Sequence, residues 1–186
     1  TTGKIAKVLD KAKYEKVDEK DYDDDDMEDY AEDGFYVTLK DSKNLKSLAK
    51  SFDFDKDDVK AVFAGAKMDD GNMIMTMVYE FNDKDTAEDF YDDMVDELKD
   101  EVKDFKEEDD DDSKVETNKG DNFYQFGYQF DWSDWDIYME SYADVRIDGT
   151  TVTVITVTAS EKKADVIDDL NDICEALKID SPADLI

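Results

Sequence analysis

The chain has no histidine and only one cysteine, one arginine and one proline among its 186 residues. Without histidine, the Ser-His and Cys-His nucleophile systems are excluded, and so are the usual zinc sites. The lone Cys174 cannot form an intramolecular disulfide, and its place on an apolar helix stripe indicates a buried, inert thiol. The seven glycines are scattered, so the sequence offers no phosphate-binding glycine loop.

Positive charge is also scarce. Lysine and arginine total 23 against 54 acidic residues, which gives a formal net charge of -31. Binding to nucleic acid needs clustered basic residues, and no basic run is present, so nucleic acid is not an expected partner. The same charge repels anionic bilayers and attracts cations and basic proteins. No apolar run approaches the roughly 20 residues of a membrane span.

Apolar residues are nevertheless abundant. Hydrophobic residues make up 40% of the chain and aromatic residues 12%, which predicts a packed core and not a disordered acidic tail. The chain begins at Thr1, so we expect that a signal peptide or lipoprotein leader was removed, with a lipid anchor on the missing N-terminus as one form of it. In its lysine-rich, arginine-poor, acidic composition, the chain resembles secreted or lipoprotein-type proteins of Gram-positive bacteria. This resemblance implies an extracellular or cell-surface location.

Hydrophobic periodicity predicts alternating helices and strands. Asp-Gly pairs at Gly71 and Gly149 predict two tight hairpin turns. In the strand at 73–81 both alternating sets of side chains are mostly apolar, so both faces are expected to be buried and the strand to be central in the sheet. The helices are expected at 4–14, 43–52, 85–106 and 161–178, and the strands at 35–39, 59–68, 73–81, 123–130, 138–147 and 151–158.

Each of the two hairpins leads directly into an amphipathic helix. This pattern predicts a duplicated strand-turn-strand-helix unit, and a ferredoxin-like order is the alternative description. Both give an α+β fold in which an antiparallel sheet has helices packed on one face. We expect an N-terminal helix and acidic segment at 1–34, a first repeat at 35–112 and a second repeat at 113–186, packed as one globular unit.

The acidic segment that follows the first helix contains a candidate metal site. Five of its carboxylates occupy positions 1, 3, 5, 9 and 12 of a calcium loop of the EF-hand kind: Asp21, Asp23, Asp25, Asp29 and Glu32. Asp26 stands where such a loop needs glycine for its turn. A solvated acidic linker is therefore the alternative to a calcium site, and calcium is the only candidate cofactor.

An aromatic stretch at 123–138 is the second candidate site. Four of its residues are the candidate ligand-binding side chains: Tyr124, Tyr128, Trp132 and Trp135. Aromatic rings beside Gln and Asp stack on sugars or hold peptides, although such a face is more often core. The neighbouring Asp131, Asp134 and Asp136 are the best place for a glycosidic carboxylate pair, a weak signal in so acidic a chain.

These observations favour a non-enzymatic binding protein, secreted or attached to the cell surface, whose partner is a protein or a glycan. The alternatives are a calcium-binding acidic surface protein, an acidic inhibitor or nucleic-acid mimic that occupies a basic partner, and a hydrolase that uses a carboxylate pair.

Overall fold

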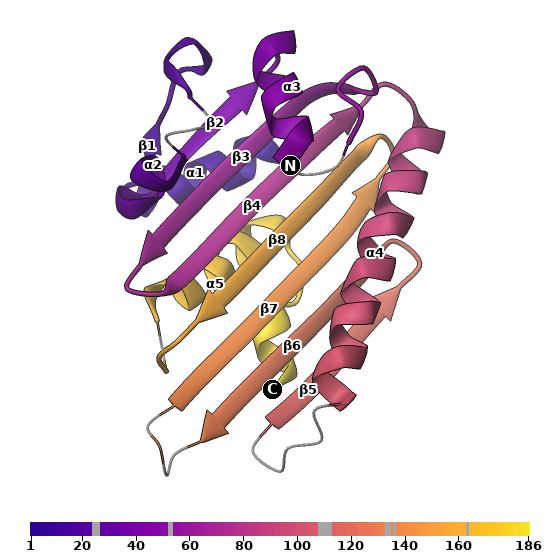
Figure 1. Ribbon diagram of the computed structural model, residues 1–186. Helices are drawn as coiled ribbons and strands as arrows, with labels where there is room; N and C mark the ends of the chain where they lie inside the picture. Colours follow the sequence, from indigo (N-terminus) through magenta and orange to yellow (C-terminus); the bar gives the residue numbers. More distant parts are fainter. Residues whose placement is uncertain (24–26, 52–53, 108–112, 133–134, 136, 163) are drawn as a thin grey trace.

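The computed structural model describes residues 1–186 except 24–26, 52–53, 108–112, 133–134, 136 and 163. Its centre is one eight-stranded sheet in the order β1-β2-β3-β4-β8-β7-β6-β5 (Figure 1). All neighbouring strands are antiparallel except the parallel pair β1 and β2. The strands are β1 (Glu15–Lys16), β2 (Phe35–Leu39), β3 (Val59–Asp69), β4 (Asn72–Phe81), β5 (Ser113–Gly120), β6 (Phe123–Trp132), β7 (Ile137–Asp148) and β8 (Thr151–Ala159).

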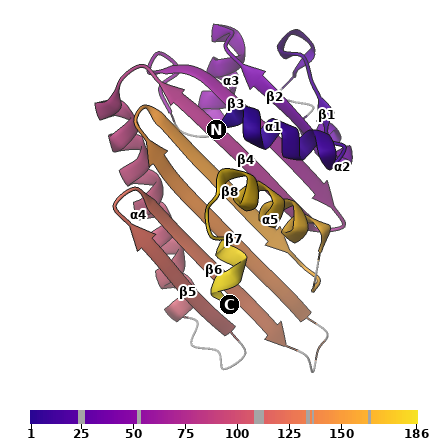
Figure 2. The ribbon, with the colours of Figure 1, turned by 180° about the vertical axis from the view of Figure 1, so that it is seen from behind.

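Helices cover both faces of this sheet. One face, which we call the front, carries α2 (Met27–Asp33), α3 (Ser42–Ser51) and α4 (Lys84–Glu107) (Figure 1). The other face, the rear, carries α1 (Thr2–Lys11), α5 (Asp165–Leu177) and the C-terminal 3-10 helix η4 (Pro182–Leu185) (Figure 2). Each face has its own apolar core, so the molecule has three layers.

The α+β prediction agrees with this structure, but the expectation of helices on one face is wrong. The central strands are apolar on both sides: in β8, Val152 packs into the front core, whereas Ile155 and Val157 pack into the rear core. Each face of such a strand must be buried, which requires a helical layer on both sides.

Neither the duplication nor the ferredoxin-like order is confirmed. Gly71 and Gly149 do lie in the hairpin turns, with φ angles of 86° and 62°. However, α4 follows the first hairpin onto the front, whereas α5 follows the second onto the rear. In addition, β6, the last strand of the ferredoxin-like order, pairs with β5 and β7 and does not return to β2–β4.

The strands and helices predicted from periodicity are present, with ends within a few residues of those expected apart from the start of α5. Two strands and one α-helix, all short or polar, were not predicted: β1, β5 and α2. β5 is an edge strand with the sequence SKVETNKG, whose side chains are mostly exposed. Its lack of an apolar face explains why the pattern did not reveal it.

A buried hydrogen bond connects the rear helical layer to the chain that follows α1. The Tyr14 hydroxyl donates to the Asp169 carboxylate of α5 at 2.7 Å, and Lys67 Nζ lies 4.0 Å from the same carboxylate. Burial, together with the neighbouring carboxylate, raises the pKa of Tyr14 far above its ordinary value of 10. Folding therefore favours the protonated phenol, and this contribution is present below pH 10 and lost as the pH rises further.

We predict that Tyr14→Phe lowers the free energy of unfolding at pH 8 by about 1–2 kcal/mol, because Asp169 loses its buried donor. Above pH 10 the difference from wild type should shrink, since the wild-type tyrosine then costs stability. Urea unfolding at pH 8, 10 and 11 measures both effects. Tyr30→Phe is the control: it removes an exposed hydroxyl that donates to the Asp21 carbonyl, and should change stability by about 0.5 kcal/mol or less. A Tyr14→Phe difference that stays constant with pH would contradict the assignment.

Candidate binding surface

The front helices leave part of the sheet uncovered. α2 and α3 lie over β2 and β3. α4 contacts β4 and β8 near its start and runs on over β7, β6 and β5, so no described helix covers the lower halves of β4 and β8 as drawn in Figure 1. In β8 the rear-facing residues Ile155 and Val157 are buried, whereas the front-facing Thr156 and Thr158 are only half-buried. The same change occurs in β4, where the front-facing Met77 is buried but Met75 and Met73 are half-buried. The sheet face is therefore accessible here.

Strand register extends this surface across five strands. Met68 pairs with Met73, Met73 with Thr158, and Thr158 with Ser141; the next residues towards the hairpin end are Met139 and its partner Phe130. We call this set the uncovered strip. Its members are Met68, Met73, Met75, Val154, Thr156, Thr158, Ser141, Met139, Phe130, Ile137 and Trp132. The strip combines apolar side chains with the hydroxyls of threonine and serine.

The strip ends in the most exposed apolar side chains of the described chain. Trp132 is 41% exposed, Ile137 is 47% exposed and Trp135 is 68% exposed, and Met68 at the opposite end is 37% exposed. The two tryptophan rings lie 5.6 Å apart, and Trp132 contacts Phe130 edge-on at 6.3 Å. Exposed apolar side chains that cluster in this way are typical of protein contact surfaces.

Acidic side chains lie along one long side of the strip and at its β3 end. On α4, Phe90 packs against Tyr79 and Phe81 of β4, which fixes the side of the helix that faces the strip. Glu97 and Glu101 follow Phe90 at helical spacing on that side and are exposed. At the Met68 end of the strip, α2 packs on β3 and exposes Asp29, Glu32 and Asp33.

The four predicted aromatic ligand residues divide into two pairs. Tyr124 and Tyr128 are buried in the front core, and Phe105 of α4 stacks on Tyr128 at a centroid distance of 4.0 Å. Trp132 and Trp135 lie beyond the end of α4 and are exposed. The structure therefore does not bring the four together on one accessible face, and ligand binding by any of them stays a prediction.

The residues of the predicted calcium loop lie in different elements. Asp21 ends the 3-10 helix η1 (Glu19–Asp21), and its carbonyl accepts a hydrogen bond from Tyr30. Asp29 and Glu32 lie in α2, and Asp25 lies outside the described residues. Within the described chain, which includes Asp23, no three acidic side chains converge as a metal site would require. Calcium binding stays a prediction.

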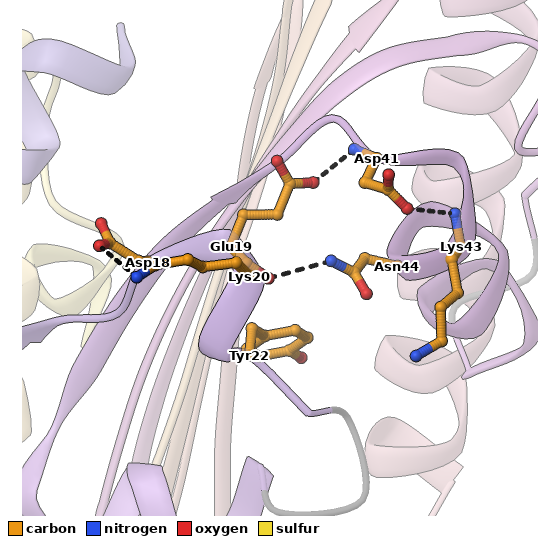
Figure 3. A pocket seen from close by; sticks show the side chains of 7 residues that line it. All are labelled: Asp18, Glu19, Lys20, Tyr22, Asp41, Lys43 and Asn44. Atoms are coloured by element: carbon orange, nitrogen blue, oxygen red, sulfur yellow. Dashed lines mark hydrogen bonds and ion pairs between the residues drawn. The ribbon is translucent and has the colours of Figure 1, made fainter.

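An open cleft of about 550 Å³ lies between η1 and the start of α3 (Figure 3). The Glu19 carboxylate accepts hydrogen bonds from the backbone N–H groups of Lys40 and Asp41, and the Asn44 side chain donates to the Glu19 carbonyl at 3.1 Å. The Asp41 carboxylate accepts from the Lys43 N–H at 2.8 Å. These contacts satisfy backbone groups at the helix start, so the cleft is a structural junction that fixes α3.

The rear surface has the opposite charge character. A cleft of about 430 Å³ between α1 and α5 is lined by four lysines, two acids and two apolar residues: Lys4, Lys7, Lys11, Lys178, Asp172, Glu175, Val8 and Ala176. Lys11 pairs with Asp172 at 3.3 Å. The front flanks are thus more acidic than this part of the rear, and the charge of the chain is not uniform.

The carboxylates of Asp131 and Glu140, which lie near the exposed Trp132 and Trp135 in the sequence, already have partners. Asp131 pairs with Lys162 at 2.6 Å, and Glu140 accepts hydrogen bonds from the hydroxyls of Tyr138 and Tyr142 at 2.6 and 3.0 Å. Asp134 and Asp136, the other two candidates for the predicted carboxylate pair, lie outside the described residues.

The only arginine belongs to a buried network that the sequence did not reveal. Arg146 Nε donates to both oxygens of Asp144 at 2.8 and 3.0 Å, and the Gln125 amide donates to Asp144 at 2.6 Å and to the Asp180 carbonyl at 2.8 Å. Burial raises the pKa of Asp144, which Arg146 partly opposes. The network fastens the segment before η4 to β6 and β7, a structural role.

No protein-family model and no curated protein matches this sequence. Among solved structures, the extracellular domain of PknH from Mycobacterium tuberculosis is similar over 77% of each chain, with 7% sequence identity and a TM-score of 0.41. A similarity of this size carries no conclusion about function. No helix in the described parts of the chain is both long and apolar enough to cross a membrane.

We predict that the intrinsic fluorescence comes from exposed indoles, because Trp132 and Trp135 are the only tryptophans. Acrylamide should quench the emission efficiently, and iodide should quench it less than caesium does, since the chain has a net charge of -31. Trp135→Phe should remove the more accessible component. Emission typical of buried indoles, resistant to acrylamide, would contradict this placement.

The calcium hypothesis makes a separate prediction. Millimolar calcium should raise the melting temperature above the value in sodium chloride of equal ionic strength, because calcium binds only the folded loop. The double variant Asp29→Asn/Glu32→Gln should lose this rise, whereas Asp92→Asn/Asp96→Asn, which removes the same charge from α4, should keep it. Equal melting temperatures in the two salts would exclude calcium binding.

Proposed function

We propose that this chain is a non-enzymatic binding protein that captures a basic partner protein on its front face. The observation that carries the proposal is the uncovered strip, an accessible apolar sheet face with acidic residues along one long side and at its β3 end. The apolar floor provides contact energy, and the carboxylates select positive charge and speed association. A secreted or cell-surface location is part of the proposal and is supported by composition alone.

A binding role fits the chemistry of the chain better than catalysis does. The absence of histidine removes the common general base. Asp131 and Glu140, the carboxylates near the exposed tryptophans in the sequence, are engaged by Lys162 and by two tyrosine hydroxyls. Met, Phe and Trp side chains with few fixed polar groups are typical of surfaces that recognise proteins.

The proposed binding to a basic partner also accommodates the hypothesis that the chain is an inhibitor. A protein that covers the cationic site of another protein inhibits it by the same contacts that bind it. The two descriptions share one surface and one charge requirement, so they differ in the consequence for the partner and not in the mode of recognition.

We predict that a lysine-bearing helical peptide binds the protein with an affinity that falls steeply as salt rises from 50 to 300 mM, and that its glutamate-bearing analogue does not bind. Glu97→Gln/Glu101→Gln should weaken binding about threefold to tenfold, because both carboxylates border the strip. The control is Asp92→Asn/Asp96→Asn, which removes two carboxylates from the opposite side of α4 and should have a smaller effect. Calorimetric titration measures each affinity. Absence of binding by any basic probe, or an affinity independent of salt, would refute the proposed function.

A further inference from the structure

The backbone of the uncovered strip restricts what can bind there. The strip lies on β3, β4, β8, β7 and β6, and each of these strands is paired on both edges. Their N–H and C=O groups are therefore used within the sheet over most of the strip; only the outer edges at Met68 and Trp132 lie past the pairings with β2 and β5, which end at Ala66 and Phe130. A segment that docks on this face gains no main-chain hydrogen bonds from it and must satisfy its own backbone groups. An α-helix does so, whereas an extended peptide requires a free strand edge.

The dimensions of the strip match a short helix. From Met68 on β3 to Phe130 on β6 there are four inter-strand steps, which at about 4.8 Å each give a length of roughly 19 Å. At about 1.5 Å per residue, a helix of roughly 13 residues covers this length. A partner helix of three to four turns therefore fills the strip from one exposed end to the other.

The arrangement of charge defines the chemistry of that helix. The floor presents Met73, Met75 and Met139, flexible side chains that adapt to an apolar stripe. Glu97 and Glu101 stand along one side of the strip, and the carboxylates of α2 stand at its β3 end. A helix seated on the floor places its apolar stripe on the methionines and projects one flank towards α4 and one end towards α2. Lysine or arginine at those positions is then favoured over any acidic residue.

We propose that the uncovered strip is a docking site for an amphipathic, basic α-helix of a partner protein, which lies across β3 to β6 with its apolar stripe on the methionines. This inference rests on the proposed function and specifies its site and the chemistry of its partner. The recognition mode is that of a helix laid on a hydrophobic surface, with cationic residues facing the carboxylates of α4 and α2.

A second copy of this chain is a poorer occupant. Face-to-face pairing of two strips would bring two sets of acidic borders together, in a chain of net charge -31. Lysines occur on the outer faces of α1 and α3, but α3 is packed on the front core through Leu45 and Leu48 and is not free to dock. α1 is itself packed on the rear core through Ile5 and Leu9, so it is not free to dock.

The test uses the full chain and a tryptophan-free peptide of about 18 residues with leucine on one side and lysine on the other. A peptide of the same composition in scrambled order, which lacks an apolar stripe, is the first control. Because Trp132 and Trp135 lie at one end of the strip, docking should shift their emission to shorter wavelength and protect them from acrylamide. We expect the amphipathic peptide to bind about tenfold or more tightly than the scrambled one.

Met73→Gln/Met75→Gln should weaken binding of the amphipathic peptide about tenfold, because the apolar floor is lost while the length and charge of the side chains are kept. The matched control is Val8→Gln, which removes a half-buried apolar side chain from the rear cleft and should leave the affinity unchanged. Thermal unfolding followed by circular dichroism verifies that both variants are folded. If Met73→Gln/Met75→Gln fails to fold, Thr156→Lys, which places a cation in the centre of the strip, replaces it with the same expected loss.

The outcomes separate this inference from the proposed function. Equal binding of amphipathic and scrambled peptides, unchanged in the strip variants but lost in salt, would overturn the docking site and leave capture of basic partners standing. Failure of every basic peptide to bind would overturn both. A concentration-dependent dimer that hides Trp132 and Trp135 without any peptide would overturn the inference in favour of a second copy.

Discussion

The pairing of β4 with β8, in register from Met73–Thr158 to Glu80–Thr151, is the contact on which the rest of the molecule depends. It joins strands from the two halves of the chain into one sheet with two broad faces. α5 buries the rear of this junction. On the front, α4 contacts β4 and β8 near its start and runs on over β7, β6 and β5, so the lower halves of the two joining strands receive no described helix. The uncovered strip is thus a consequence of how the sheet is assembled.

The large negative charge is compatible with this fold because the acids lie outside two well-formed cores. Mutual repulsion between exposed carboxylates opposes compaction, and the apolar burial in the front and rear cores offsets it. Two acids that do lie within the packing have partners there, Asp144 with Arg146 and Asp169 with Tyr14. On α4, the same helix that buries Phe90 and Val102 presents Glu97 and Glu101 beside the strip, so charge and exposed apolar surface come to lie together.

Periodicity was enough to find the long helices and strands, because each of them has a clear apolar stripe or alternation. Periodicity could not tell which face of the sheet each helix covers. α4 and α5 have similar apolar stripes, yet α4 packs on the front face and α5 on the rear face. The periodicity also grouped Tyr124 and Tyr128 with Trp132, because all three lie on the same face of β6. Their difference in exposure arises from where α4 ends, at Glu107, which no local pattern encodes.

The composition of β8 indicates that the strip faces water in the free protein. Its front-facing residues change from Val152 and Val154 to Thr156 and Thr158 as the cover of the front layer ends, while the rear-facing Ile155, Val157 and Ala159 of the same stretch are apolar and buried. Threonine keeps strand propensity and adds a hydroxyl that water can solvate, which limits the exposed apolar area and the risk of aggregation. The methionines and tryptophans that remain around these hydroxyls then provide contact area for a partner without making the face too apolar to stay exposed.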